Sequence, residues 1–391
     1  MTNHTLTKKA RRPLLTPHHP HLLSALLTFL HENTVFCIAL AAAGITSILV
    51  PPDAQYLSYF DFKTLTCLFC VLAVVCALRN IRFFTCLARG IVKRFTTLRS
   101  ASVALIVITF VGSMLIANDM ALLTFLPLGY LVLSETHMER HMAFVFIMQN
   151  IAANLGGMLT PFGNPQNLYL YSFYNIPTAE FTAIMAPPFI AAVIMILLAC
   201  LVLPRDALSL TYRDEIHLPA KRTAGYLVLF ALSIVIVFRF IPYIVGLIVI
   251  PAVLLFADRD ALKKVDYPLL GTFCAFFVFA GNMSRIPAVR ALFEGLLEKN
   301  TMLISALSCQ CISNVPSAIL LSQFTDNYRE LLWGVNIGGA GTLIASLASL
   351  ITFREYVKHN PGKTGRYLGL FTLINLIFLV SLLLFCRFVC Q

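Results

Sequence analysis

Asp119 is the acidic residue whose position in this 391-residue chain most clearly suggests chemistry, because it stands deep inside an apolar segment. The chain has 18 acidic residues, and the others lie in loops or near predicted helix ends. A carboxylate at mid-membrane costs roughly 2.5–3.5 kcal/mol on insertion scales, so such residues usually bind a cation or carry a proton. The structural alternative is a helix cap, in which Asp119 or Asn118 accepts backbone N–H groups. Because a carboxylate at this depth is costly, we expect Asp119 to be functional. A capping role is compatible with this function.

An asparagine marks the centre of each of two apolar segments, Asn118 in residues 101–133 and Asn314 in residues 300–324. We expect each segment to form a re-entrant hairpin with a polar tip. Two half-helices that meet at mid-membrane leave free N–H groups, which attract an anion, and free carbonyls, which suit Na⁺. An asparagine side chain both donates and accepts hydrogen bonds, so Asn118 and Asn314 can serve either ligand.

Two further segments, residues 142–175 and 330–351, combine apolar residues with clusters of glycine, and the first also contains proline. Such clusters break helices, and broken backbone at membrane depth is tolerated only where it is buried in protein or lines a polar cavity. A kinked packing helix is the simpler alternative for one cluster. Two clusters in corresponding places favour a binding site. The small polar side chains beside them are Thr160, Asn164 and Asn167 in the first segment, and Asn336, Thr342, Ser346 and Ser349 in the second.

The composition indicates an all-α integral membrane protein. Charged residues make up 12% of the chain and hydrophobic residues 59%, whereas a soluble domain has about 25% charged residues. This excludes a soluble enzyme, a disordered chain and a nucleic-acid-binding domain. The net charge of +11 is typical of basic cytoplasmic loops. Because no nucleophile with a base, zinc spacing or phosphate loop is recognisable, we expect no enzyme activity, no metal site, no cofactor and no nucleic-acid partner.

The same features follow one another twice, which indicates an internal duplication. Each series starts at an aspartate that opens an apolar span, Asp61 or Asp266, and continues through a charged stretch, a hairpin and a Gly-rich broken helix. We therefore divide the chain into a cytoplasmic tail (1–33), a first repeat (34–204), a loop with a linking helix (205–242) and a second repeat (243–391).

The positions of the basic residues predict the orientation. With nine full crossings and two hairpins, most of the 29 Lys and Arg residues fall on one side, together with the N-terminus. The positive-inside rule makes that side cytoplasmic and makes the two repeats inverted. The basic stretch 79–99 is then either an arm that grips lipid headgroups or an ordinary basic loop.

Four sequence motifs stand out at these positions: Asn118-Asp119, Thr160–Asn167 (TPFGNPQN), Ser313–Ser317 (SNVPS) and Ser346–Leu350 (SLASL). Together they resemble the ion transporter superfamily, which includes citrate-transporter-like permeases, divalent-anion/sodium symporters, and arsenite and NhaD-type permeases. Within it the chain is most similar to the YbiR type of bacterial inner-membrane protein. The ordering covers nearly all of the chain from about residue 34.

The resemblance implies a homodimer in the inner membrane that works by elevator motion. In divalent-anion symporters, Ser-Asn-Thr tips hold the substrate carboxylates, with Na⁺ beside each tip. The half-sites implied here are Asn118, Gly163 and Asn164 in the first repeat, and Ser313, Asn314, Ala345 and Ser346 in the second. Ala117-Asn118-Asp119 and Val315 depart from the tip pattern. An acidic tip should repel a dianion and is more similar to the arsenite and NhaD branches.

We therefore expect a secondary active transporter of a small anion, driven by H⁺ or Na⁺, with Asp119 as the coupling residue. A Na⁺/H⁺ antiporter, a metalloid-anion efflux permease and, more distantly, a passive channel are the alternatives. The residues expected to bind substrate are Asn118, Thr160, Asn164, Asn167, Ser313, Asn314, Ser317 and Ser346. Those expected to couple the ion are Asp119, Asn118, Gly163, Asn314 and Ala345.

Overall fold

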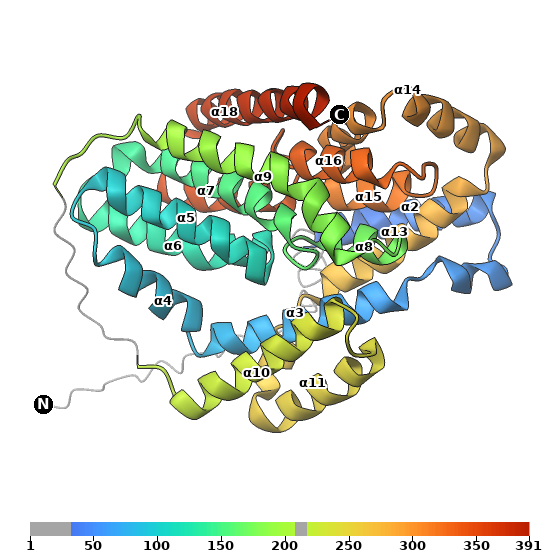
Figure 1. Cartoon of the computed structure of the whole chain (residues 1–391), viewed down its shortest axis with the longest axis horizontal. Coiled ribbons are helices and arrows are strands. Elements are labelled where there is room, and N and C mark those ends of the chain that lie inside the picture. The colour runs from blue at the N-terminus through green and yellow to red at the C-terminus, as the bar shows by residue number, and fades with distance from the viewer. Residues whose placement is uncertain (1–32, 208–216, 391) are drawn as a thin grey trace, which may run out of the picture.

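Helices make up most of the backbone in the computed structural model, which describes residues 33–207 and 217–390 (Figure 1). Within those ranges there is no β-sheet, and the only strand-like pairing is an isolated bridge between Thr97 and Ala207. The expected tail, residues 1–33, lies outside the described residues except for Asn33, and so does part of the loop that follows residue 205.

The helices occur in two consecutive sets that are separated by α10. The first set is α2 (Thr34–Leu49), the short η1 (Ala54–Tyr59), α3 (Phe62–Asn80), α4 (Phe83–Val92), α5 (Leu98–Ile116), α6 (Asn118–Glu135), α7 (Met142–Gly156), α8 (Pro165–Phe173) and α9 (Thr178–Cys200). After α10 (Ala220–Val237) come α11 (Tyr243–Ala257), α12 (Arg259–Lys263), α13 (Tyr267–Ser284), α14 (Pro287–Ile312), α15 (Asn314–Leu321), α16 (Tyr328–Gly338), α17 (Leu347–His359) and α18 (Thr364–Phe385).

The lengths and composition of these helices agree with an all-α membrane protein. Within the described residues, seven helical segments are long and apolar enough to cross a bilayer, and α2, α4 and α11 are shorter apolar helices. The helical segment Leu98–Ile116 of the first expected hairpin is among the seven. Four of these seven segments bury only 28–44% of their apolar window inside the protein, so their other faces are suited to contact with lipid.

Aspartates start two of the helices, as their places in the sequence suggest. The Asp61 carboxylate accepts a hydrogen bond from Thr64 N at the start of α3 (3.0 Å). Asp266 accepts one from Leu269 N at the start of α13 (2.9 Å). Each carboxylate satisfies a backbone donor that has no partner within its own helix.

Helices α3 and α13 run in opposite directions, as contacts at both ends indicate. Before α3, Asp53 pairs with Arg285 at the end of α13, with N–O distances of 2.7 and 3.2 Å. At the last residue of α3, Asn80 donates to Asp258, which precedes α13 along the chain (3.0 Å). The guanidinium of Arg285 also holds the pKa of Asp53 below its usual value, chiefly through this hydrogen bond.

Helices α10 and α11 pack on α3 and on each other, and they form the group at the bottom of Figure 1. On the other side of the molecule, α5, α6 and α7 pack together, and α18 covers α7, α9 and α16. Helix α2 packs along α13. This arrangement brings the ends of α5, α6, α14 and α15 to the interior, where the candidate site lies.

Candidate functional site

The backbone breaks at Ala117, between α5 and α6, and at Ser313, between α14 and α15. Ala117 has φ 64° and ψ 153°, and Ser313 has φ 74° and ψ 161°. This region is occupied almost solely by glycine, and a residue with a side chain held there costs about 1–3 kcal/mol. The same strained geometry therefore occurs at both expected hairpin tips.

The asparagine after each break makes the same local hydrogen bond. Asn118 Oδ1 accepts from Asp119 N (3.0 Å), and Asn314 Oδ1 accepts from Val315 N (2.9 Å). Each oxygen satisfies an N–H group in the first turn of the new helix, α6 or α15. The tip asparagines thus have a structural role in addition to any contact with a ligand.

A second pair of breaks lies beside the tips. Helix α8 begins after Asn164 and α17 begins after Ser346, whose hydroxyl accepts from Ala348 N (3.2 Å). A threonine lies four residues before Asn164, and another lies four residues before Ser346. In both cases its hydroxyl donates to a backbone carbonyl in the helix that leads to the tip asparagine. Thr160 donates to Met114 O (2.8 Å), and Thr342 donates to Gln310 O (3.5 Å).

A cavity of about 290 Å³ lies between the two tips and α13. Of the residues that the sequence predicts to bind substrate, four line it: Asn118, Ser313, Asn314 and Ser346. The expected coupling residue, Asp119, lines it too. The opposite wall is mostly apolar and comes from α2 and α13, where Thr272 is a polar exception. None of the described residues that line the cavity carries a positive charge.

Four other expected substrate residues are outside this lining and make contacts that hold the breaks in shape. Thr160 is bonded to Met114 as described, and the Ser317 hydroxyl pairs with that of Ser308 (2.8 Å). Asn167 donates to Gly157 O (3.2 Å), and Asn164 donates to Asn154 O (3.2 Å).

Gly163 and Ala345, which the resemblance implies as cation ligands, are also outside the lining. The Ala345 carbonyl accepts from Asn314 N (3.0 Å), and a Cβ on Gly163 would collide with Gly157. Their backbone therefore closes the turns at the two breaks.

A network of buried amides links the two sets of helices behind the cavity. Asn118 Nδ2 donates to Asn154 Oδ1 (3.1 Å) within the first set. Asn336 accepts from Asn164 (3.3 Å) and donates to Asn167 (2.6 Å), which joins α16 to the first set. The sequence shows these residues as parts of the Gly-rich motifs, but it does not indicate that they bond to one another.

Gln166 is a cavity residue that sequence reasoning missed. It follows Asn164 and Pro165 within the broken-helix motif, and its position there is the signal that could have found it. The carboxamide oxygen of Gln166 and the carboxylate Oδ1 of Asp119 are both buried without a hydrogen-bond partner in the structure. Buried acceptors without donors are costly, so a cation or a proton would stabilise this wall.

The described residues contain no cluster of three or more His, Cys, Asp or Glu side chains placed to hold a metal ion. The chemistry of the cavity therefore depends on amides, hydroxyls, helix ends and one carboxylate.

The family model of the citrate transporter matches residues 23–328, which is most of the chain. The chain belongs to the citrate transporter family. This confirms the resemblance predicted from the four motifs.

Three relatives cover most of the chain. An uncharacterized transporter of Methanocaldococcus jannaschii is 34% identical over 328 residues, which are 82% of this chain and 89% of that protein. The inner membrane protein YbiR of Escherichia coli is 32% identical over 282 residues, 70% of this chain and 74% of YbiR. The 46 kDa membrane protein of Mycobacterium leprae is 23% identical over 376 residues, with coverage of 82% and 85%.

Membership of the citrate transporter family, together with the apolar helices, makes this protein a multi-pass membrane transporter. The family and the names of the relatives point to transport rather than to enzyme catalysis.

Proposed function

We propose that this citrate transporter family member is a secondary active transporter that moves a small anion, organic or inorganic, together with H⁺ or Na⁺. The observation that carries the proposal is the cavity that both strained tips share, with Asp119 on its wall. The N-termini of α6 and α15 lie at these tips, and their dipoles favour an anion. The unpartnered oxygen of Asp119 supplies a position for the coupling ion.

We also propose that the two sets of helices are inverted repeats with re-entrant hairpins, and that they support elevator motion in a homodimer. The matching breaks at Ala117 and Ser313 and the antiparallel α3 and α13 support the repeats. In this arrangement α2, α3, α11 and α13 belong to a scaffold, and the tips move against it. The N-terminus is cytoplasmic, and the bilayer is that of the inner membrane.

A Na⁺/H⁺ antiporter is the second candidate, and one observation favours it. The described cavity wall has a carboxylate and no Lys or Arg, which suits a cation better than a dianion. In an antiporter, Asp119 would bind Na⁺ and H⁺ alternately. Efflux of a metalloid anion is a variant of the anion-transport proposal, and a passive channel is a more distant alternative that would show flux without gradient dependence.

Asp119→Asn in proteoliposomes tests the proposal. Small organic acids and inorganic oxyanions are offered under an imposed H⁺ or Na⁺ gradient, and we expect the variant to lose at least nine-tenths of the gradient-driven flux. Asp326→Asn, in an exposed loop, removes the same charge and should transport normally. Undiminished coupled flux in Asp119→Asn would disprove the coupling role.

A dye assay of the pH gradient in everted vesicles separates the two candidates. An antiporter dissipates the gradient when Na⁺ is added without any anion, whereas an anion symporter requires the anion. If the pH gradient collapses when Na⁺ alone is added, the protein is a Na⁺/H⁺ antiporter and the anion-transport proposal is wrong.

A further inference from the structure

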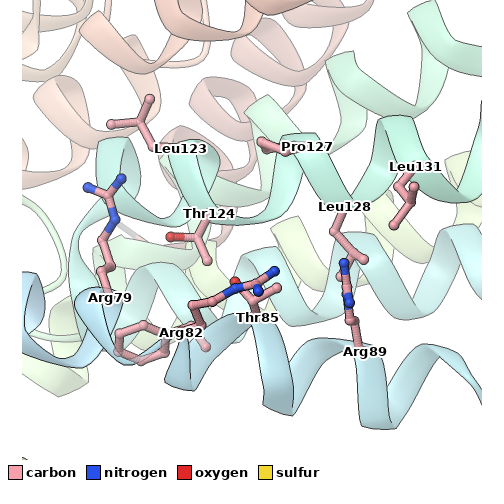
Figure 2. A pocket seen from close by; sticks show the side chains of 10 residues that line it. Arg79, Arg82, Thr85, Arg89, Leu123, Thr124, Pro127, Leu128 and Leu131 are labelled. Atoms are coloured by element: carbon pink, nitrogen blue, oxygen red, sulfur yellow. The ribbon is translucent and has the colours of Figure 1, made fainter. Parts of the chain in front are cut away.

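Three arginines converge on a second pocket, which is separate from the cavity between the tips. The pocket has a volume of about 310 Å³ and lies between the end of α3, helix α4 and helix α6. Arg79, Arg82 and Arg89 line it from one side, and residues of α6 line it from the other (Figure 2). The hydroxyl-bearing residues Thr85 and Thr124 also line it. No carboxylate occurs among the described residues of its lining.

Two of the three arginines, Arg79 and Arg82, have a weak partner or none among the described residues. Arg79 NH1 donates to the sulfur of Met120 (3.1 Å), which is a poor acceptor. The guanidinium of Arg82 has no hydrogen bond or ion pair to any residue that the structure describes. Asp119, next to Met120 in the chain, lines the other cavity. The guanidinium groups of Arg79 and Arg82 carry like charges and repel each other unless an anion lies between them.

We propose that this arginine pocket binds a phosphate-type oxyanion, carried by the headgroup of an anionic phospholipid or free in solution. Guanidinium groups match phosphate oxygens in a bidentate geometry and are the preferred partners of phosphate in proteins. The two threonine hydroxyls can add hydrogen bonds to the same oxygens. The arginine pocket lies apart from the proposed transport site, and its described lining is positively charged whereas that of the transport site is not. This proposal therefore does not depend on the proposed function.

The surroundings of the pocket suit a lipid. Leu123 and Pro127 on α6 are exposed at the pocket, so part of its rim is apolar. Phe84 lines both this pocket and an apolar groove of about 670 Å³ between α4 and α5. A phospholipid whose headgroup lies among the arginines therefore has an apolar surface for its chains on the other face of α4.

Binding there would join two elements with different roles. Helix α4 is a short amphipathic segment, and α6 starts at the tip residue Asn118. An oxyanion held between Arg82 or Arg89 on one side and α6 on the other would attach the tip helix to α4.

The test is thermal unfolding of the purified, delipidated full chain in a neutral detergent, titrated separately with phosphatidylglycerol, phosphatidylcholine and inorganic phosphate. A ligand that binds the folded protein raises its unfolding midpoint. The pocket variant is Arg82→Gln with Arg89→Gln. Its matched control is Arg94→Gln with Arg366→Gln, which removes the same charge from exposed positions outside the pocket.

We expect the wild type and the control variant to be stabilised by phosphatidylglycerol at concentrations at least tenfold lower than by phosphatidylcholine. The pocket variant should need at least tenfold more phosphatidylglycerol, and Arg82→Lys with Arg89→Lys should recover part of the difference. Stabilisation by phosphatidylglycerol alone identifies a lipid-borne ligand, and equal stabilisation by inorganic phosphate identifies a free one.

Two results would overturn the proposal. One is a wild-type protein whose unfolding midpoint is raised by phosphatidylglycerol and by inorganic phosphate no more than by chloride at the same ionic strength. The other is a pocket variant that responds like its control. If the double variant fails to fold, Arg82→Gln alone allows the same comparison with Arg94→Gln, because both side chains are exposed.

Discussion

At the scale of single residues, the site is held together by amides that bond to one another. Asn336 is the centre of this set: it accepts from Asn164 and Gln166 and donates to Asn167 and to Leu332 O. All four partners lie in a buried region, where an unsatisfied polar group costs about 1–3 kcal/mol. The amides therefore fix the positions of two broken helices in addition to any contact with a transported solute.

Asn336→Ala should lower the stability of the protein by about 3 kcal/mol, because it leaves several buried groups without partners. The matched control is Asn375→Ala, since Asn375 is also a buried asparagine but its side chain makes only one hydrogen bond to the described part of the chain, to Phe371 O (2.9 Å). Thermal unfolding in detergent measures both variants. Equal losses in the two would show that the amide network adds nothing beyond a single buried hydrogen bond.

At the scale of elements, the breaks between helices are the distinctive feature. Ala117 and Ser313 have backbone angles that glycine would adopt without strain. The sequence places a side chain at each, and the flanking helices together with the hydrogen bonds of Asn118 and Asn314 hold the conformation. Strain retained in this way is typical of functional sites.

Ala117→Gly should raise the free energy of unfolding by about 1 kcal/mol, because glycine relieves the strain. Ala117→Val should lower it by about 2 kcal/mol, since a β-branched residue fits positive φ poorly. Ala121→Gly, inside α6, is the control. Here the same exchange should lower the free energy of unfolding by about 1 kcal/mol, because glycine destabilises a helix interior. A loss of stability in Ala117→Gly would show that the break does not have the strained conformation.

At the scale of the whole molecule, each set of helices completes the other. Helix α2 packs on α13, and α11 packs on α3, so each leading helix lies against the opposite set. The cavity takes its walls from both sets. Neither half could form the site alone.

The proposed orientation can be tested by labelling single cysteines with an impermeant maleimide. Ser58→Cys, before α3, should be labelled in intact cells, and Lys263→Cys, before α13, only after permeabilisation, because the inverted repeats put these positions on opposite faces. Both residues are exposed. A chain with the exposed Cys311 replaced by Ser is the background. Labelling of both positions from the same side would contradict the inversion.

The sequence by itself determined the fold class, the places of the helix breaks and the family. Charge-free apolar windows indicate membrane helices because a bilayer excludes charge, and Gly, Pro and Asn in such windows mark broken backbone. Only the tertiary structure decided that Asn118, Asp119, Ser313, Asn314 and Ser346 share one cavity, whereas Thr160, Asn167 and Ser317 bond within the protein. It also brought three arginines of the basic stretch 79–99 together against α6. Spacing along a chain predicts which face of a helix a residue occupies, but which helices meet depends on packing between segments that are far apart in the sequence.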